Sequence, residues 1–301
     1  MAAEWGPRSF GYLAELALLG LLATLWGASY TFIKLGVESI PPVTFIAART
    51  AIAAVVLLGV LHWRGMAMPT DLAIWRRFLL QASLNSVIPF TLIAWAEQSV
   101  DAGLATILNS SAPIFASILT WCFARRQSAI GRQLFGVISG VIGICLIVGV
   151  QALSGIGQQL VAQLAIITAT ICYAGAAIFG RTFQGLDPML PATGSLVCGA
   201  IILIPISLVM DHPWALTPST RSIVALLCLS VFSTALAFTI YFRLIQTLGL
   251  VGSTSQAYLR VPIGVTIGVV FLGEILAPTT LIGLVCVIAG VAAMTIPART
   301  R

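Results

Sequence analysis

The sequence predicts an all-α integral membrane protein with ten transmembrane helices, arranged as two inverted sets of five. Three observations support this prediction. Of the 301 residues, 59% are hydrophobic and only 8% are charged, whereas about a quarter of the residues in an ordinary soluble domain carry charge. The apolar residues fall in blocks of about 20, the length that a helix needs to cross a bilayer. The chain also matches itself at a nearly constant offset.

Ten apolar blocks, bounded by charged residues, proline or glycine, are the candidate spans. They cover residues 13–34, 43–62, 78–97, 103–124, 131–150, 160–181, 189–210, 222–243, 250–272 and 279–296. The connections between the blocks are short, so we expect no separate soluble domain. The first block is too long for a signal peptide, and further spans follow it at once.

The basic residues predict that both ends of the chain lie in the cytoplasm. In that orientation eleven of them fall on cytoplasmic segments: Arg8, Arg64, Arg76, Arg77, Arg125, Arg126, Arg132, Arg181, Arg243, Arg299 and Arg301. Only Lys34, Arg49 and Arg221 fall outside, and Arg260 lies within a span. Because cytoplasmic loops of membrane proteins are enriched in Lys and Arg, the reverse orientation is disfavoured by eleven residues to three.

Matched residues indicate an internal duplication. Trp26 matches Tyr173 at an offset of 147 residues, and Pro113 matches Pro262 at 149. The two predicted repeats are residues 1–150 and 155–301. Each repeat holds five spans, an odd number, so the second enters the membrane in the opposite direction. Inverted repeats recur in secondary transporters, whose two halves expose one site to either side in turn, and the pattern therefore favours a carrier over a channel.

The distribution of charge and cysteine argues against several other classes of protein. The net charge of +6 is spread between the apolar blocks, whereas nucleic-acid-binding proteins gather Lys and Arg on one face or tail. The six cysteines lie in apolar runs without metal-ligand or redox spacing, and the two histidines are far apart. The sequence contains no P-loop motif for ATP hydrolysis. We expect no catalytic residues, no metal and no cofactor.

Short motifs, in order along the chain, resemble the EamA-type members of the drug/metabolite transporter superfamily. They are WGASY at 26–30, AAR at 47–49, AP at 112–113, VP at 261–262 and FLGE at 271–274. The resemblance implies ten helices around a central cavity, and export or exchange of amino acids or related metabolites. Within the family, the chain looks most similar to YddG-like aromatic amino-acid exporters. It departs from the family pattern at Arg125, where a Glu is often found.

Arg260 is the most unusual residue, because it lies about ten positions into a span of roughly 22 and therefore near the middle of the bilayer. A charged side chain there costs about 2.5 to 3.5 kcal/mol on insertion scales, which favours a polar cavity over lipid. Its guanidinium can hold a substrate carboxylate through two hydrogen bonds. A structural ion pair, or a side chain that reaches toward the bilayer surface, is the alternative.

Polar and aromatic residues on other spans complete the candidate substrate site. The full set of candidates is Trp26, Tyr30, Asn85, Asn109, Ser110, Tyr173, Gln256, Tyr258 and Arg260. Pro113 and Pro262 each free a backbone carbonyl and can break or bend a helix into a gate. Aromatic rings can stack on an apolar substrate. The alternatives are packing kinks for the prolines, interhelical hydrogen bonds for the polar side chains and core packing for the rings.

These features predict a multi-pass secondary transporter of a bacterial inner membrane, which exports aromatic or other apolar amino acids, or related metabolites, by alternating access. The alternatives are a membrane sensor or receptor that does not transport, and a carrier of nucleotide-sugars or drug-like solutes. An enzyme is disfavoured, since it would need clustered Asp, His or Ser at one interface. The expected partners are a small-molecule substrate and the lipid bilayer, with the chain as a monomer or weak homodimer and without nucleic acid.

Overall fold

The computed structural model describes residues 7–123, 135–136, 138–143, 146, 158–248, 256–275 and 278–295, and these residues form helices and turns without strands. Six helical segments are long and apolar enough to cross a membrane: Leu13–Gly36, Pro42–Trp63, Leu72–Ala96, Gln159–Phe183, Met189–Met210 and Thr220–Thr247. Three shorter apolar helices are Ala102–Ala116, Leu259–Leu272 and Pro278–Gly290. Most of the predicted fifth span, residues 131–150, lies outside the described residues.

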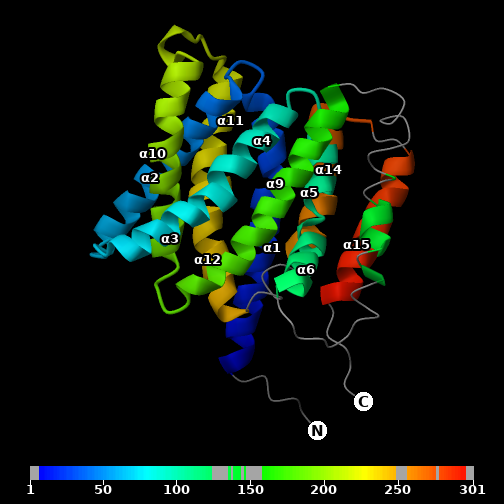
Figure 1. Ribbon diagram of the computed structural model, residues 1–301, viewed down its shortest axis with the longest axis horizontal. Helices are drawn as coiled ribbons and strands as arrows, with labels where there is room; N and C mark the ends of the chain where they lie inside the picture. Colours follow the sequence, from blue (N-terminus) through cyan, green and yellow to red (C-terminus); the bar gives the residue numbers. More distant parts are fainter. Residues whose placement is uncertain are drawn as a thin grey trace.

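The helices follow the predicted blocks in order, and their labels are those of Figure 1. The first part of the chain forms α1 (Pro7–Gly36), α2 (Pro42–Trp63), α3 (Leu72–Ala82), η1 (Ser83–Val87), α4 (Ile88–Ala96), α5 (Ala102–Asn109) and α6 (Ala112–Phe123). The second part forms α9 (Gln158–Gly180), η2 (Arg181–Phe183), α10 (Met189–Met210), η3 (Pro213–Ala215), α11 (Thr220–Ser230), η4 (Val231–Leu236), α12 (Ala237–Thr247), α14 (Gln256–Leu272) and α15 (Pro278–Thr295).

The third predicted span begins earlier than the sequence pattern indicated. Residues 78–97 were the expected block, whereas α3 begins at Leu72. The Asp71 carboxylate accepts a hydrogen bond from the Ala73 backbone N–H at 2.8 Å, which caps the first turn. The added turns carry Arg76 and Arg77, both exposed. Hydropathy therefore located the apolar part of this helix, while the capping residue determines where the helix starts.

Two of the long helices contain a π-helical turn. The Ile88 N–H donates to the Ser83 carbonyl in η1, and the Ala237 N–H donates to the Phe232 carbonyl in η4. Each bond spans five residues instead of four, as in a π-helix. The turn η1 joins α3 to α4 within the segment Leu72–Ala96, and η4 joins α11 to α12 within Thr220–Thr247.

Helices from the two parts of the chain pack against one another along their lengths. Figure 1 shows them side by side: α2 packs on α10, α1 on α14 and α4 on α9. Gly27 and Gly264 permit the closest approach of α1 to α14. A Cβ atom on Gly27 would lie 3.1 Å from the Arg260 carbonyl oxygen, and one on Gly264 would lie 3.1 Å from the Gly27 carbonyl oxygen. The backbones meet at a point where side chains would separate them.

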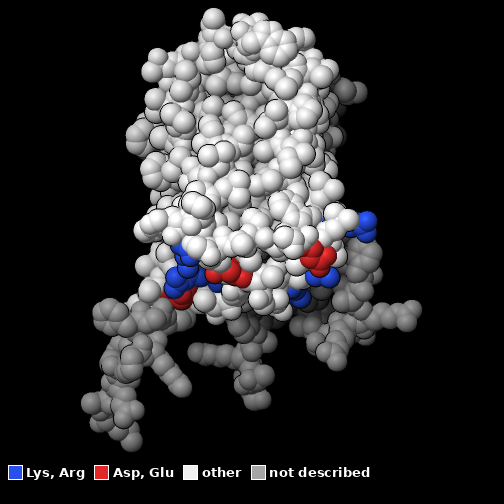
Figure 2. All heavy atoms as spheres, turned by 90° about the vertical axis from the view of Figure 1, so that its left-hand side faces the viewer, with Lys and Arg blue, Asp and Glu red and all other residues white. Residues whose placement is uncertain are grey.

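The outer surface has the distribution of charge expected of a protein surrounded by lipid. On the face formed by α2, α3 and α10, charged side chains gather in a band at one end, and the rest of the face has none (Figure 2). Large apolar side chains are exposed along the helices, among them Val55, Ile201 and Val270. Four charged residues are exposed here: Arg64 and Asp71 in the α2–α3 connection, and Arg76 and Arg77 in the first turns of α3.

Candidate functional site

A cavity of about 110 Å³, enough for several water molecules, lies between helices from both parts of the chain. Seven of the nine predicted substrate-binding residues line it: Trp26, Tyr30, Asn85, Asn109, Tyr173, Gln256 and Arg260. Ser110 is buried but is not part of the lining, and its hydroxyl donates to the Ile107 carbonyl at 2.5 Å. The side chain of Tyr258 lies outside the described residues.

Arg260 enters the cavity from α14, and only 7% of the residue is exposed. Its Nη2 donates to the backbone carbonyl of Asn109 at 3.3 Å. In a regular helix that carbonyl would accept a bond from residue 113, but Pro113 has no N–H to give. The proline thus leaves a buried acceptor for the arginine. The Nε of Arg260 is buried and has no hydrogen-bond partner among the described residues.

Arg49 lines the cavity from α2, which corrects its predicted place among the external charges. It is only 3% exposed. Its Nε donates to the Thr234 hydroxyl at 2.8 Å, and its guanidinium carbon lies 3.6 Å from the centroid of the Phe90 ring. The sequence signal was present, since an arginine seven residues into an apolar block is as unusual as Arg260. Only Lys34 and Arg221 then remain as predicted external charges.

The two π-helical turns each bring a polar side chain to this region. Asn85 of η1 lines the cavity, and its amide nitrogen is buried without a partner among the described residues. Thr234 of η4 accepts the bond from Arg49 and donates its own proton to the Leu229 carbonyl at 2.8 Å. Single π-helical turns within α-helices are frequent at functional sites.

Asn109 organises the polar side of the cavity. Its amide nitrogen donates to the Tyr30 hydroxyl, and its amide oxygen accepts from the Thr170 hydroxyl at 3.1 Å. With its carbonyl bonded to Arg260, the residue links α1, α9 and α14. A hydrogen-bond network of this kind fixes side-chain positions more strongly than single contacts do.

Aromatic rings form the other side. Trp26 lies 5.1 Å from Tyr241 and 6.5 Å from Phe238, centroid to centroid. Phe90 lies 6.4 Å from Tyr173. Phe90, Phe238 and Tyr241 were not predicted, because aromatic residues within apolar spans are not distinguishable from core residues by sequence pattern alone. The assembled rings, inclined to one another, offer an apolar surface for a substrate side chain.

The two predicted helix breaks have different outcomes. The fourth span is interrupted at Ser110 and Ser111, between α5 and α6, just before Pro113. By contrast α14 continues through Pro262, which excludes a break there, while the predicted bend or gate at this residue stays a prediction. Membrane helices tolerate proline where neighbouring groups satisfy the freed backbone.

Polar contacts join several segments at the end of the molecule at which α1 ends, which we call the Lys34 end. The Lys34 Nζ donates to the carbonyls of Glu97 and Val100 at 2.7 and 2.9 Å, so its charge stabilises the last turn of α4. The Glu274 carboxylate accepts from the first two amides of α5, Ala102 and Gly103, at 2.7 and 2.8 Å. Lys34 therefore holds two segments together and does not extend toward the bilayer surface.

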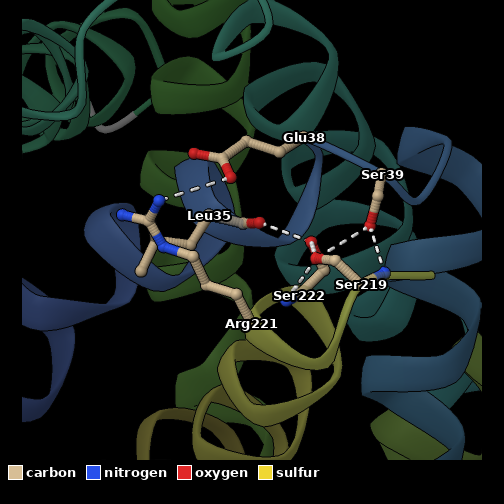
Figure 3. Close-up of polar contacts among 6 residues, drawn as sticks. All are labelled: Leu35, Glu38, Ser39, Ser219, Arg221 and Ser222. Carbon is tan, nitrogen blue, oxygen red and sulfur yellow. Dashed lines mark hydrogen bonds and ion pairs between the residues drawn. The ribbon is translucent and has the colours of Figure 1, made fainter.

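A second set of contacts at the Lys34 end joins the α1–α2 turn to α11. Figure 3 shows the Ser222 hydroxyl donating to the Leu35 carbonyl at 2.8 Å, and the Ser219 N–H donating to the Ser39 hydroxyl at 3.0 Å. Arg221 lies 3.8 Å from Glu38 in an exposed ion pair. These bonds tie the turn between α1 and α2, two helices that line the cavity, to α11, which contributes no described residue to the lining.

Comparison with known proteins identifies the family. The model for the EamA-like transporter family matches residues 14–149 and, separately, residues 160–296. The chain belongs to the EamA-like transporter family.

Curated relatives of this EamA-like chain include several membrane transporters. It is 26% identical over 267 residues to the "Uncharacterized inner membrane transporter YedA" of Escherichia coli K12, covering 87% of this chain and 85% of the relative. It is 25% identical over 281 residues to the "Probable terminal-alkyne amino-acid exporter" of Streptantibioticus cattleyicolor, covering 91% and 90%. A solved structure titled "Crystal structure of protein" superposes with a TM-score of 0.66, at 14% identity over 92% of this chain and 96% of that one. This last likeness is one of fold.

Proposed function

We propose that the chain is a secondary transporter that exports amino acids with aromatic or other apolar side chains, or related small metabolites, across a bacterial inner membrane by alternating access. The observation that carries the proposal is the cavity, which combines two buried arginines with aromatic rings deep inside a membrane protein. The arginines suit a carboxylate, and the rings suit an apolar side chain. The relative described as an amino-acid exporter supports the same class of substrate.

The proposed architecture has ten spans in two inverted sets of five, residues 1–150 and 155–301, with both termini in the cytoplasm. The separate family matches to residues 14–149 and 160–296 support two related halves. The contacts of α1 with α14 and of α2 with α10 support an interleaved arrangement. Opening of the Lys34 end, coupled to closing of the opposite end, would expose the cavity to the other side of the membrane.

Flux through the purified protein tests the proposal. In proteoliposomes we expect labelled phenylalanine or a related apolar solute to cross faster than in protein-free vesicles. Binding without flux would indicate a sensor instead of a carrier. Flux of nucleotide-sugars alone would reassign the substrate.

Substitutions of Arg260 test its role as the carboxylate ligand. We expect Arg260→Gln to weaken binding by about tenfold or more, because a buried charged partner is lost. Arg260→Lys should lose less, since it keeps the charge but not the bidentate geometry. Arg77→Gln, the same change at an exposed position of α3, is the matched control and should have no effect. Unchanged affinity in both Arg260 variants would show that this residue does not hold the carboxylate.

A further inference from the structure

The acidic residues that the structure describes all lie outside the cavity lining. The chain has nine acidic residues: Glu4, Glu15, Glu38, Asp71, Glu97, Asp101, Asp187, Asp211 and Glu274. All but Glu4 lie among the described residues, and none of these eight lines the cavity. Most already serve elsewhere: Glu274 caps α5, and Asp211 accepts from the Thr44 N–H and hydroxyl at 2.9 and 2.8 Å.

The two cavity arginines are therefore paired with neutral groups. Arg49 bonds to a hydroxyl and lies over a ring, and Arg260 bonds to a backbone carbonyl. Neither forms an ion pair with any described residue. A buried cation without a counter-ion is costly, and a bound anion relieves that cost. The cavity thus favours a ligand with net negative charge.

A free amino acid fits this environment poorly at its amino group. Its carboxylate would meet the arginines, but its ammonium would enter a cavity that already holds two positive charges. The described lining offers an ammonium only neutral acceptors: each Asn109 oxygen already accepts one hydrogen bond, from Thr170 or from Arg260, and Gln256 Oε1 is buried without a partner among the described residues. A buried ammonium without a carboxylate partner loses hydration that neutral groups only partly replace.

We propose that the preferred substrate is an organic carboxylate without an amino group, bearing an aromatic or branched apolar part. This inference rests on the proposed transport function and narrows its substrate class. The arginines of α2 and α14 hold the carboxylate, and the rings of Trp26, Phe238 and Tyr241 hold the apolar part. The described lining has no acidic side chain, so the ammonium of an amino acid has no carboxylate partner there. We propose that this difference selects against ligands with an amino group.

Three ligands that share one phenyl ring test the proposal at pH 7: 3-phenylpropionate, L-phenylalanine and phenethylamine. The first carries only the carboxylate, the third only the amine and the second both. We expect 3-phenylpropionate to bind the purified protein at least about tenfold more tightly than phenylalanine. Phenethylamine should show no binding. Phenylalanine binding as tightly as 3-phenylpropionate, or no binding by 3-phenylpropionate, would overturn the inference.

A charge introduced into the cavity provides a second test. Asn85→Asp adds a carboxylate to the lining, so the ratio of affinities should shift toward phenylalanine by about tenfold. Gln98→Glu adds the same charge at an exposed position and is the matched control. Because both ligands are measured on one sample, the ratio does not depend on the fraction of folded protein. An unchanged ratio in Asn85→Asp would contradict the proposed role of the missing acid.

Flux and binding separate this inference from the proposed function. If 3-phenylpropionate binds preferentially but no tested solute crosses proteoliposomes, the transport function fails and the selectivity stands. If phenylalanine crosses and 3-phenylpropionate neither binds nor crosses, the transport function stands and the selectivity fails.

Discussion

At the scale of single residues, the N–H that Pro113 lacks bears on how the Arg260 guanidinium is held. Pro113 lacks an N–H, so the Asn109 carbonyl one turn earlier is free to accept from Arg260 at 3.3 Å. The same Asn109 bonds Tyr30 and Thr170 through its side chain. From the sequence, Pro113 predicts only a break or bend in its own helix. In the structure it also leaves a carbonyl to which Arg260 of another helix can bond.

Glu97 is the second residue with an unusual environment. It follows directly after the span that ends at Ala96, it is fully buried, and neither carboxylate oxygen has a partner among the described residues. Burial raises the pKa of Glu97 well above its usual range, and Glu274 adds to this rise. The Lys34 ammonium and, more weakly, Arg49 oppose it. The folded protein therefore favours the neutral carboxyl.

This raised pKa predicts that stability falls as pH rises. Below the unfolded value, near 4.3, both states are protonated and the contribution of Glu97 is complete. As pH rises toward the folded pKa, only the unfolded state ionises, and stability falls by at most about 1.4 kcal/mol per pH unit. The unfolding temperature in detergent at pH 5 and pH 8 measures the change. Glu97→Gln should reduce this dependence.

The control for this prediction is Glu38→Gln, the same substitution at an exposed position of the Lys34 end. Its pH dependence should equal that of the unmodified chain. A Glu97→Gln variant with the original pH dependence would assign the titration to another group.

Residues were predictable from sequence where their chemistry contrasts with their surroundings. Arg260, Asn85 and Asn109 are polar residues within apolar spans, and the structure places all three on the cavity. Arg49 gave the same signal but was assigned to the external charges. Phe238 and Tyr241 gave no signal, because an aromatic ring in an apolar helix is equally at home facing lipid, core or cavity.

At the scale of helices, the interruptions are what the sequence could not reveal. A π-helical turn adds one residue between helices without leaving a break in hydropathy, so η1 and η4 were invisible to periodicity. The break between α5 and α6 was signalled by Pro113, yet Pro262 stands in a continuous helix. The difference lies in how neighbouring groups satisfy the backbone, which depends on tertiary contacts.

The close approach of α1 to α14 predicts the effect of adding a methyl group. A Cβ atom on Gly264 would lie 2.7 Å from Cγ2 of Thr106 and 3.1 Å from the Gly27 carbonyl oxygen. Gly264→Ala should therefore lower the free energy of unfolding by about 1 to 3 kcal/mol, because the added methyl group forces α1 and α14 apart. The unfolding temperature in detergent measures this loss.

Thr106→Ala provides the partner for a double-mutant cycle. It removes the methyl group and hydroxyl nearest to the new Cβ, so the double variant should recover much of the stability lost in Gly264→Ala. Additive losses in the two substitutions would show that steric overlap with Thr106 is not the cause.

At the scale of the whole molecule, orientation in the membrane is the main untested prediction. Thr217 lies in the exposed α10–α11 connection and Ala67 in the exposed α2–α3 connection. With the termini in the cytoplasm, residue 217 lies outside and residue 67 inside. In a background without the six native cysteines, an impermeant maleimide should label Thr217→Cys in intact cells, and Ala67→Cys only after permeabilisation. The reverse pattern would invert the proposed topology.

The apolar helices could be located from the sequence, because a block of about 20 apolar residues has the length and composition of a transmembrane helix. It could not show how α2 packs on α10 or α1 on α14, since those contacts join residues more than 120 positions apart. The cavity is a product of that packing. Its residues were therefore predictable as candidates, and their assembly was not.

The unpaired arginines have a consequence for energy conversion. A carrier that moves a carboxylate without an ammonium moves one negative charge per cycle, and a cytoplasm at negative voltage drives that charge outward. For one charge the driving force is about 2.3 kcal/mol per 100 mV. At 100 mV this corresponds to an equilibrium concentration of the carboxylate about 50 times higher outside than inside. Export on these terms would draw on the resting voltage of the cell, and it would need neither a proton-binding carboxylate in the cavity nor ATP.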